Sequence, residues 1–191
     1  MPHINTAPGQ HDHTASAYIF KIHPYDDHFQ KTGSLKPLML LHMHKKLKKL
    51  LQPGGHIELN ETPWQTMKHE LLEETGYDLS QLSIMQPLET VPTLANKDSI
   101  LHPVPYVYNT HKVTDEHFHT DIGYLFVTQE FPNHEVGEGE STDLRWVTQE
   151  ELNAFTPDEI SSGVKDIGNA AFAAVDNQEH WWGRSTDDFQ S

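Results

Sequence analysis

The chain has 191 residues, enough for one domain with a sizeable hydrophobic core. It carries 13 Lys and Arg against 28 Asp and Glu, so its formal net charge is -15 with 15 His counted as neutral. Such a surface repels nucleic-acid backbones and anionic lipids, which argues against a duplex-binding or membrane-binding protein. It also repels a phosphorylated small molecule, unless a bound cation reverses the local charge.

The chain contains no Cys, which excludes disulfides, thiolate metal sites and a cysteine nucleophile. The first residues do not resemble a signal peptide, and no apolar run approaches the ~20 residues of a membrane span. We therefore expect a cytoplasmic protein. We also expect residues 1–12 to be a flexible lead-in, residues 13–175 to form one domain, and residues 176–191 to be a tail.

The first half of the chain contains two apolar segments that predict strands, at residues 15–22 and 38–44. A basic run from Lys45 to Lys49 follows. The Pro53-Gly54-Gly55 sequence then breaks the backbone pattern and predicts a turn.

Helix signals follow this turn. Thr62 is expected as the N-cap, Pro63 occupies the first helical position, and Gln65 completes a capping box. Gly76 supplies a stop signal. We predict a helix from Pro63 to about Thr75.

Later segments continue the mixture of strands and helices. Strands are predicted over residues 84–93, 117–128 and 144–147, with a Pro-rich loop around 101–106, and a second helix over 157–175. This order predicts an α/β (α+β) fold in which a sheet lies between helices.

Three carboxylates gather near the C-terminal end of the first predicted helix. They are Glu70, Glu73 and Glu74, and the apolar stripe beside them is Trp64, Met67, Leu71 and Thr75. Like charges at these spacings destabilise an isolated helix by roughly 0.2–0.5 kcal/mol per pair, and the helix dipole disfavours them there. A solvated acidic face is the plain alternative, but no Lys or Arg lies one turn away from Glu73 or Glu74. Oxygen ligands so arranged suit Mg²⁺ or Mn²⁺.

The stretch from Gly55 to Tyr77, GHIELNETPWQTMKHELLEETGY, resembles the Nudix box. The matching positions are Gly55, Glu61, Glu70, Leu71, Glu73, Glu74 and Gly76. His69 stands where the family has an Arg that orients a neighbouring catalytic carboxylate. The likeness extends over roughly His13 to Leu152, and resembles a Nudix subfamily with a Gln-Pro-Gly-Gly-His turn before the box and a His-x-His-x-Asp strand after it.

The resemblance implies a Nudix-type α/β/α sandwich with a mixed sheet. It also implies divalent-metal-dependent hydrolysis of a phosphoanhydride linkage in a nucleoside diphosphate derivative, such as a sugar nucleotide, ADP-ribose or a nucleoside triphosphate. The cofactor is expected to be Mg²⁺ or Mn²⁺, and the implied metal ligands are the carbonyl of Gly55 and the carboxylates of Glu70, Glu73 and Glu74.

The catalytic residues are expected to be Glu70, Glu73 and Glu140, with Glu73 or Glu140 as the general base. Glu140 lies in a Gly-rich loop, where Gly137 and Gly139 allow movement over a substrate. Asp143 lies in the same loop. An acidic loop can also serve solubility alone, so both alternatives stay open here.

His117, His119 and Asp121 alternate along a predicted strand and therefore share one face. A polar outer face of the sheet is the plain alternative. The resemblance favours substrate contact for these three residues and for His56, while a second metal site is the less favoured alternative. Pro92 lies close to the position of a proline in ADP-ribose-cleaving family members, which favours ADP-ribose or a sugar nucleotide as the substrate.

The rival function is a non-catalytic nucleotide-binding sensor with the same fold, for which His69 is the supporting feature. Isoprenoid diphosphate isomerisation on this fold uses a catalytic Cys in the family, and the chain has none. The expected partner is a small-molecule nucleoside diphosphate derivative, and a homodimer is compatible with the sequence.

Overall fold

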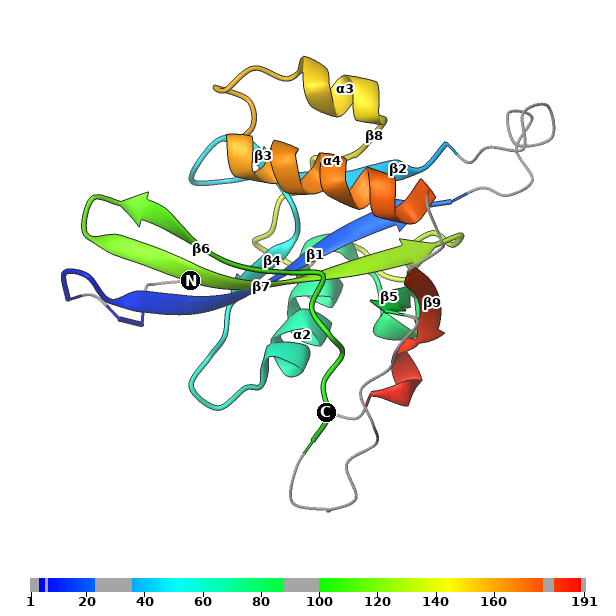
Figure 1. The fold of residues 1–191 in the computed structure, drawn as a ribbon, viewed down its shortest axis with the longest axis horizontal. Helices are drawn as coiled ribbons and strands as arrows, with labels where there is room; N and C mark the ends of the chain where they lie inside the picture. Colours follow the sequence, from blue (N-terminus) through cyan, green and yellow to red (C-terminus); the bar gives the residue numbers. More distant parts are fainter. Residues whose placement is uncertain (1–3, 6, 23–35, 88–99, 177–180, 190–191) are drawn as a thin grey trace.

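The computed structural model describes residues 4–5, 7–22, 36–87, 100–176 and 181–189. Within these residues a nine-stranded mixed sheet lies between helix α2 (Pro63–Thr75) on one side and helices α3 (Gln149–Ala154) and α4 (Ser162–Asp176) on the other (Figure 1). The expected α/β sandwich with a mixed sheet between helices is confirmed.

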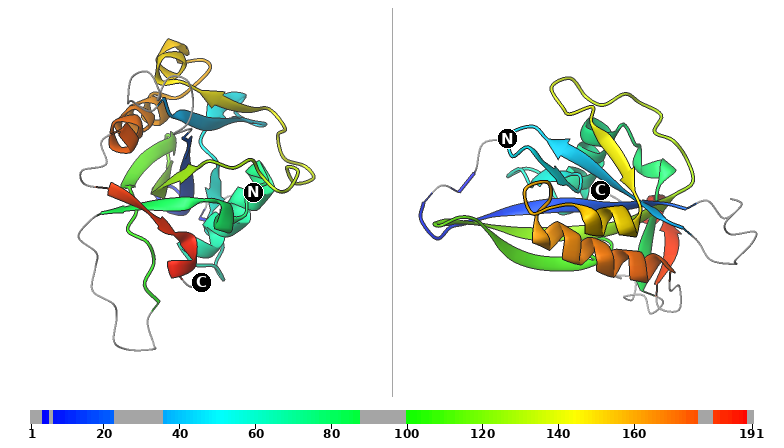
Figure 2. Two further views of the ribbon diagram at one scale, coloured as in Figure 1. Left: turned by 90° about the vertical axis from the view of Figure 1, so that its right-hand side faces the viewer. Right: turned by 90° about the horizontal axis from the view of Figure 1, so that it is seen from above.

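The sheet runs in the order β3-β2-β1-β7-β5-β9, while β4 pairs with β1, β6 with β7, and β8 with β2. The strands are β1 (His11–Lys21), β2 (Leu38–His44), β3 (Lys49–Leu51), β4 (Gly54–His56), β5 (Ser83–Pro87), β6 (Val107–Thr114), β7 (His117–Thr128), β8 (Leu144–Val147) and β9 (Trp181–Ser185). Short 3₁₀ turns follow α2 and β9 at Leu79–Gln81 and Thr186–Asp188. Strands β1 and β7 are parallel along the full length of β1, and the two views in Figure 2 show them along the middle of the sandwich.

Several predicted elements have the expected bounds. The strands at 38–44, 117–128 and 144–147 and the helix Pro63–Thr75 are confirmed. Thr62 and Gln65 form the predicted capping box, and Gly76 ends the helix with a left-handed φ of 74°. The part of the predicted 84–93 strand beyond Pro87, including Pro92, lies outside the described residues.

Other elements differ from the expectation. Strand β6 was not predicted. It is largely exposed and has no hydrophobic alternation, although its Val, Tyr and Thr residues favour strands, and it pairs with β7. Strand β9 falls in the segment expected to be a tail, where it pairs antiparallel with β5. Helix α4 begins at Ser162 rather than at residue 157, because Ile160 instead forms a bridge to Leu50.

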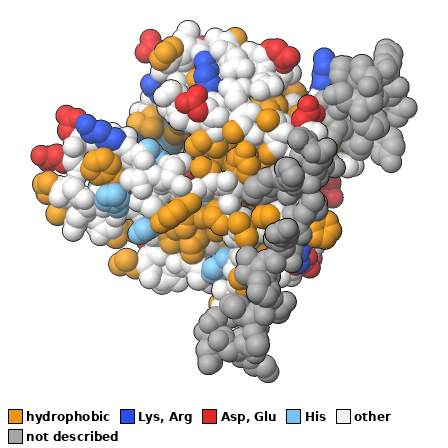
Figure 3. Space-filling view, in the orientation of Figure 1, with side chains coloured by type: hydrophobic (Ala, Val, Ile, Leu, Met, Phe, Trp, Pro, Cys, Tyr) orange, Lys and Arg blue, Asp and Glu red, His pale blue; other side chains and the backbone are white. Residues whose placement is uncertain are grey.

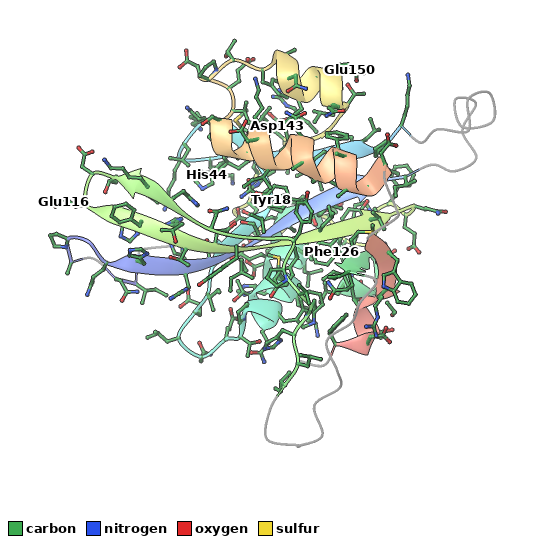
Figure 4. The ribbon with its side chains drawn as sticks, in the orientation of Figure 1. Tyr18, His44, Glu116, Phe126, Asp143 and Glu150 are labelled. Carbon is green, nitrogen blue, oxygen red and sulfur yellow. The ribbon has the colours of Figure 1, made fainter. Side chains whose placement is uncertain are left out.

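Two hydrophobic cores lie on opposite faces of the sheet. Alternate residues of β1 enter each one, because successive strand side chains point to opposite faces. Ala17 and Ile19 pack with α2, whereas Tyr18 and Phe20 pack with α4. Figure 4 shows Tyr18 on the α4 side of the sheet and Phe126 on the α2 side. Among the described residues, no helix is both long enough and apolar enough to cross a membrane.

Candidate active site

Helix α2 separates its three C-terminal carboxylates instead of placing them together. Its apolar stripe is buried as expected. Glu70 and Glu74 turn towards the sheet and are only 5% and 7% exposed. The side chain of Glu73 points outward and is 53% exposed. The sequence therefore identified the three carboxylates, while the packing of α2 on the sheet determines which two of them are buried.

The glycine turn brings the backbone of β4 against these two buried carboxyl groups. The N–H of Gly54 donates a hydrogen bond of 2.8 Å to Oε2 of Glu74. A Cβ atom on Gly55 would collide with the carboxylate of Glu70. A Cβ atom on Gly54, whose φ is 149°, would collide with the carbonyl of Ala15. Gly54 is thus needed for the close approach of β4 to β1, while Gly55 leaves room for the carboxylate of Glu70.

Burial makes these two carboxyl groups weaker acids than an ordinary Glu side chain. It raises the pKa of Glu70 to about 7 and that of Glu74 to about 8, and neighbouring carboxylates add to both shifts. Among the described residues, Oε1 of Glu70 has no hydrogen-bond partner.

His42 approaches Glu74 from β2 but brings no compensating charge. Its Nδ1 lies 3.6 Å from Oε1 of Glu74. Burial, followed by the charge of His44, lowers the pKa of His42 to about 4, so the ring is neutral at pH 7. Buried hard oxygen donors without a fixed cation fit a divalent ion such as Mg²⁺ or Mn²⁺. His42 and His44 alternate in β2 and so share one strand face beside the basic run, where exposure was the expectation. His42 is instead buried, at 3% exposed.

His69 joins two acidic side chains on the outer side of α2. Its Nδ1 lies 3.3 Å from Oε1 of Glu61, and its Nε2 lies 3.2 Å from Oε1 of Glu73. Burial alone would lower the pKa of His69, but Glu73, Glu70 and Glu61 together raise it above the ordinary value. This imidazole sits where the Nudix pattern has Arg, and its acidic neighbours favour its protonated form.

The Gly-rich loop comes to the C-terminal end of α2. The N–H of Gly137 donates to the carbonyl of Glu73 over 2.7 Å, and the N–H of Glu140 donates to the carbonyl of Gly137 over 3.0 Å. The charge of Glu140 contributes to the raised pKa of both Glu70 and Glu74.

Asp143 behaves differently from Glu140. It forms two hydrogen bonds with Arg145, of 2.9 and 2.7 Å, at the surface. The hydrogen bond from Arg145 lowers the pKa of Asp143. Both oxygens of the Asp143 carboxylate therefore accept hydrogen bonds from Arg145.

The predicted substrate-binding residues lie on the other face of the sheet. Gly55 faces Glu70, so the side chain of His56, the next residue in β4, is directed away from α2. His56 and His119 approach with their Nε2 atoms 3.3 Å apart. His117 joins the group through Asp12, with Nε2 3.3 Å from Oδ2. Figure 3 shows hydrophobic side chains gathered in the middle of one face of the molecule, with His side chains beside them.

Asp121 is 2% exposed and accepts hydrogen bonds from the hydroxyls of Thr14 (2.7 Å) and Ser16 (2.8 Å). Its pKa is raised by burial, although these two bonds oppose the shift. Substrate contact by Asp121, and by the three His residues, stays a prediction. Asp12 was missed because it falls in the expected lead-in. Its alternation with Thr14 and Ser16 was the available signal.

Comparisons with known proteins agree with the fold. A family model described as the NUDIX domain matches residues 29–165. A solved NUDIX-family hydrolase from Clostridium perfringens is 27% identical, with a TM-score of 0.63 over 86% of this chain and 97% of that one. The NUDIX domain of Shewanella oneidensis NrtR, complexed with ADP ribose, is 15% identical, with a TM-score of 0.57 over 87% and 89%.

The C. elegans Ap4A hydrolase is 15% identical to this chain, with a TM-score of 0.54 over 87% of this chain and 98% of that one. The last two likenesses concern the fold. A comparison with curated protein sequences found no significant match.

Proposed function

Because the chain belongs to the Nudix family and is a Nudix hydrolase, we propose that it cleaves a phosphoanhydride linkage in a nucleoside diphosphate derivative with Mg²⁺ or Mn²⁺. The observation that carries this proposal is the burial of Glu70 and Glu74 against the Gly54-Gly55 turn. Two adjacent buried carboxyl groups are unfavourable when ionised, unless a cation compensates them.

The residues that would hold the cation are Glu70, Glu74 and the carbonyl oxygen of Gly55, with Glu73 sharing the site. When bound, such a cation supplies positive charge that neutralises the oxygens of the phosphate groups. The N–H of Gly54 fixes one oxygen of Glu74. His69 holds Glu73 and Glu61, so that the outer carboxylates keep their orientation.

Glu140 is our proposed general base. Water attacks one phosphorus atom, its proton passes to the carboxylate of Glu140, and the bridging P–O bond breaks with the electron pair leaving on the second phosphate. Glu73 is the alternative base, but His69 already engages its Oε1 at 3.2 Å. The charge of Glu140 acts on both buried carboxyl groups, and its loop is anchored to the carbonyl of Glu73.

The chain offers a matched pair of variants for this choice. Glu138 lies in the same loop and is exposed. We expect Glu140→Gln to lower kcat by about 10²–10⁴-fold, the usual contribution of general base catalysis, and Glu138→Gln to leave it unchanged. If Glu140→Gln keeps the same kcat as Glu138→Gln, the general base would be Glu73 instead.

The substrate is sought among sugar nucleotides, ADP-ribose, dinucleoside polyphosphates and nucleoside triphosphates, with Mg²⁺ or Mn²⁺. Products are identified by mass, and reaction in ¹⁸O-labelled water marks the phosphorus that is attacked. We expect two phosphorylated products, one of which carries the label. Tight binding of a nucleotide, with no turnover of any of these compounds, would instead indicate a non-catalytic nucleotide-binding sensor.

A further inference from the structure

A second group of metal-ligating side chains lies on the sheet face opposite α2. Asp12, His56 and His119 each bring one ligand atom within 4.8 Å of the other two. They come from β1, β4 and β7, and β1 pairs with both of the other strands. In the register Asp12 is the partner of His119, and Thr14 is the partner of both His56 and Asp121. We call these three residues the Asp-His cluster.

The distances within the Asp-His cluster match the spacing of ligands around one ion. The Nε2 atoms of His56 and His119 are 3.3 Å apart. Nε2 of His56 lies 3.5 Å from Oδ2 of Asp12. Two ligands at 2.0–2.1 Å from a tetrahedral zinc ion are about 3.3–3.4 Å apart. A charge-assisted hydrogen bond between imidazolium and carboxylate is shorter, at about 2.7–2.9 Å.

The carboxylate of Asp12 is held in place by groups outside the cluster. Oδ1 accepts a 2.7 Å hydrogen bond from the N–H of Asn5, and Oδ2 accepts one of 3.2 Å from the N–H of Ile4. Nε2 of His117 lies 3.3 Å from the same Oδ2 atom. Outer contacts of this kind are typical of metal-binding carboxylates, because they orient the ligand before the ion arrives.

Burial favours a bound ion over a solvated polar patch. The side chain of Asp12 is 1% exposed and that of His56 is 12% exposed. The rings of His56 and His119 are nearly perpendicular, with centroids 4.8 Å apart. Imidazole nitrogen with one carboxylate suits late first-row divalent ions such as Zn²⁺, whereas Mg²⁺ prefers oxygen alone.

We propose that Asp12, His56 and His119 bind a zinc-class transition-metal ion at a second site, separate from the carboxylate site of α2. The three side chains leave the fourth tetrahedral position for water. The ion links the N-terminal segment, β4 and β7. Since His56 follows Gly55 directly, the same ion also steadies the turn that borders Glu70. This inference does not depend on the proposed hydrolysis.

The test uses the full chain, stripped of metal and kept in excess Mg²⁺, with Zn²⁺ as ligand and Co²⁺ as spectroscopic probe. We expect one tight Zn²⁺ site per chain, a rise in Tm on adding Zn²⁺, and the strong visible absorption of tetrahedral Co²⁺. His56→Asn and His119→Asn should each weaken Zn²⁺ binding by more than the 10–100-fold expected on losing an outer contact. His117→Asn should fall within about that 10–100-fold range.

Two control variants separate zinc binding at the Asp-His cluster from zinc binding elsewhere on the chain. His134 is exposed and pairs with Asp78 away from the cluster, so His134→Asn should bind Zn²⁺ normally. The double variant Glu70→Gln, Glu74→Gln should also keep the Zn²⁺ site. Loss of Zn²⁺ binding in that double variant alone, or equal binding by all His variants, would overturn the proposal and leave the cluster a hydrogen-bonded polar group only.

If a His variant does not fold, Zn²⁺ binding to the wild-type chain provides a second test of the site. Zn²⁺ should shift the imidazole NMR signals of His56 and His119 at one equivalent and leave that of His134 unchanged. Unshifted signals for His56 and His119 would refute the site.

Discussion

Nε2 of His69 lies 3.2 Å from Oε1 of Glu73, one helical turn further along α2. The other ring nitrogen lies 3.3 Å from Oε1 of Glu61, so one imidazole holds two carboxylates on either side of Glu70. Although burial opposes it, the surrounding Glu residues raise the pKa of His69. The ring can therefore carry the positive charge that Arg carries permanently.

His69→Arg should preserve or raise kcat, because a guanidinium keeps the charge and can still contact both Glu61 and Glu73. The measurement is kcat and KM on the best substrate, at pH 7 and pH 9. A large loss of turnover in a folded variant would contradict this and show that the imidazole itself transfers a proton.

Glu70→Gln and Glu74→Gln should each lower turnover by orders of magnitude and weaken Mg²⁺ binding. Without metal, their thermal stability should stay level or rise, because each change removes a carboxyl group whose ionised form burial disfavours, while keeping the side-chain size. Glu150→Gln, on the exposed first turn of α3, is the matched control. Wild-type turnover of either variant at limiting Mg²⁺ would rule out the metal assignment.

The stability of the metal-free chain should fall as the pH rises from about 4.5 towards 8. Glu70 and Glu74 have folded-state pKa values of about 7 and about 8 against 4.5 in the unfolded chain, so the folded chain binds more protons across this window. Urea unfolding in EDTA at several pH values measures the effect. The double variant Glu70→Gln, Glu74→Gln should show a flatter profile, and an identical profile would disprove the two shifts.

The two glycines of the turn should respond differently to Ala. Gly54→Ala places a Cβ against the backbone of Ala15 at a φ of 149°, and should destabilise the fold by about 1–3 kcal/mol. Gly55→Ala meets only the end of the Glu70 side chain, which can move. It should therefore leave stability almost unchanged and reduce activity. Chemical denaturation and kcat for both variants test this contrast, which fails if Gly54→Ala is the more stable of the two.

Asp121 should contribute to stability in addition to its predicted contact with the substrate. Asp121→Ala leaves the hydroxyls of Thr14 and Ser16 without their acceptor and should destabilise the fold by about 1–3 kcal/mol. Asp121→Asn keeps an acceptor oxygen and should have the smaller effect. Unfolding free energies and KM are measured together, and unchanged stability of Asp121→Ala would contradict this contribution to stability.

Local sequence signals predicted the elements that depend on neighbouring residues. The capping box of Thr62 and Gln65, the stop at Gly76 and the apolar stripe of α2 all involve residues a few positions apart, so they could be read directly from the sequence. The same holds for the strand at 117–128, whose apolar content is dense. Strand β6 was not predicted because it lacks a buried alternating face, and its pairing with β7 is not visible in the local sequence.

The spacing of the motif residues was enough to predict the family, the helix that carries the carboxylates and the chemistry expected of them. The burial of Glu70 and Glu74 and the exposure of Glu73 could not be predicted from the sequence, since the packing of α2 on the sheet sets their environment. Only the strand register brought Asp12 beside His56 and His119. The physical reason is that pairing across strands joins residues far apart in the chain, and no local pattern records which strands become neighbours.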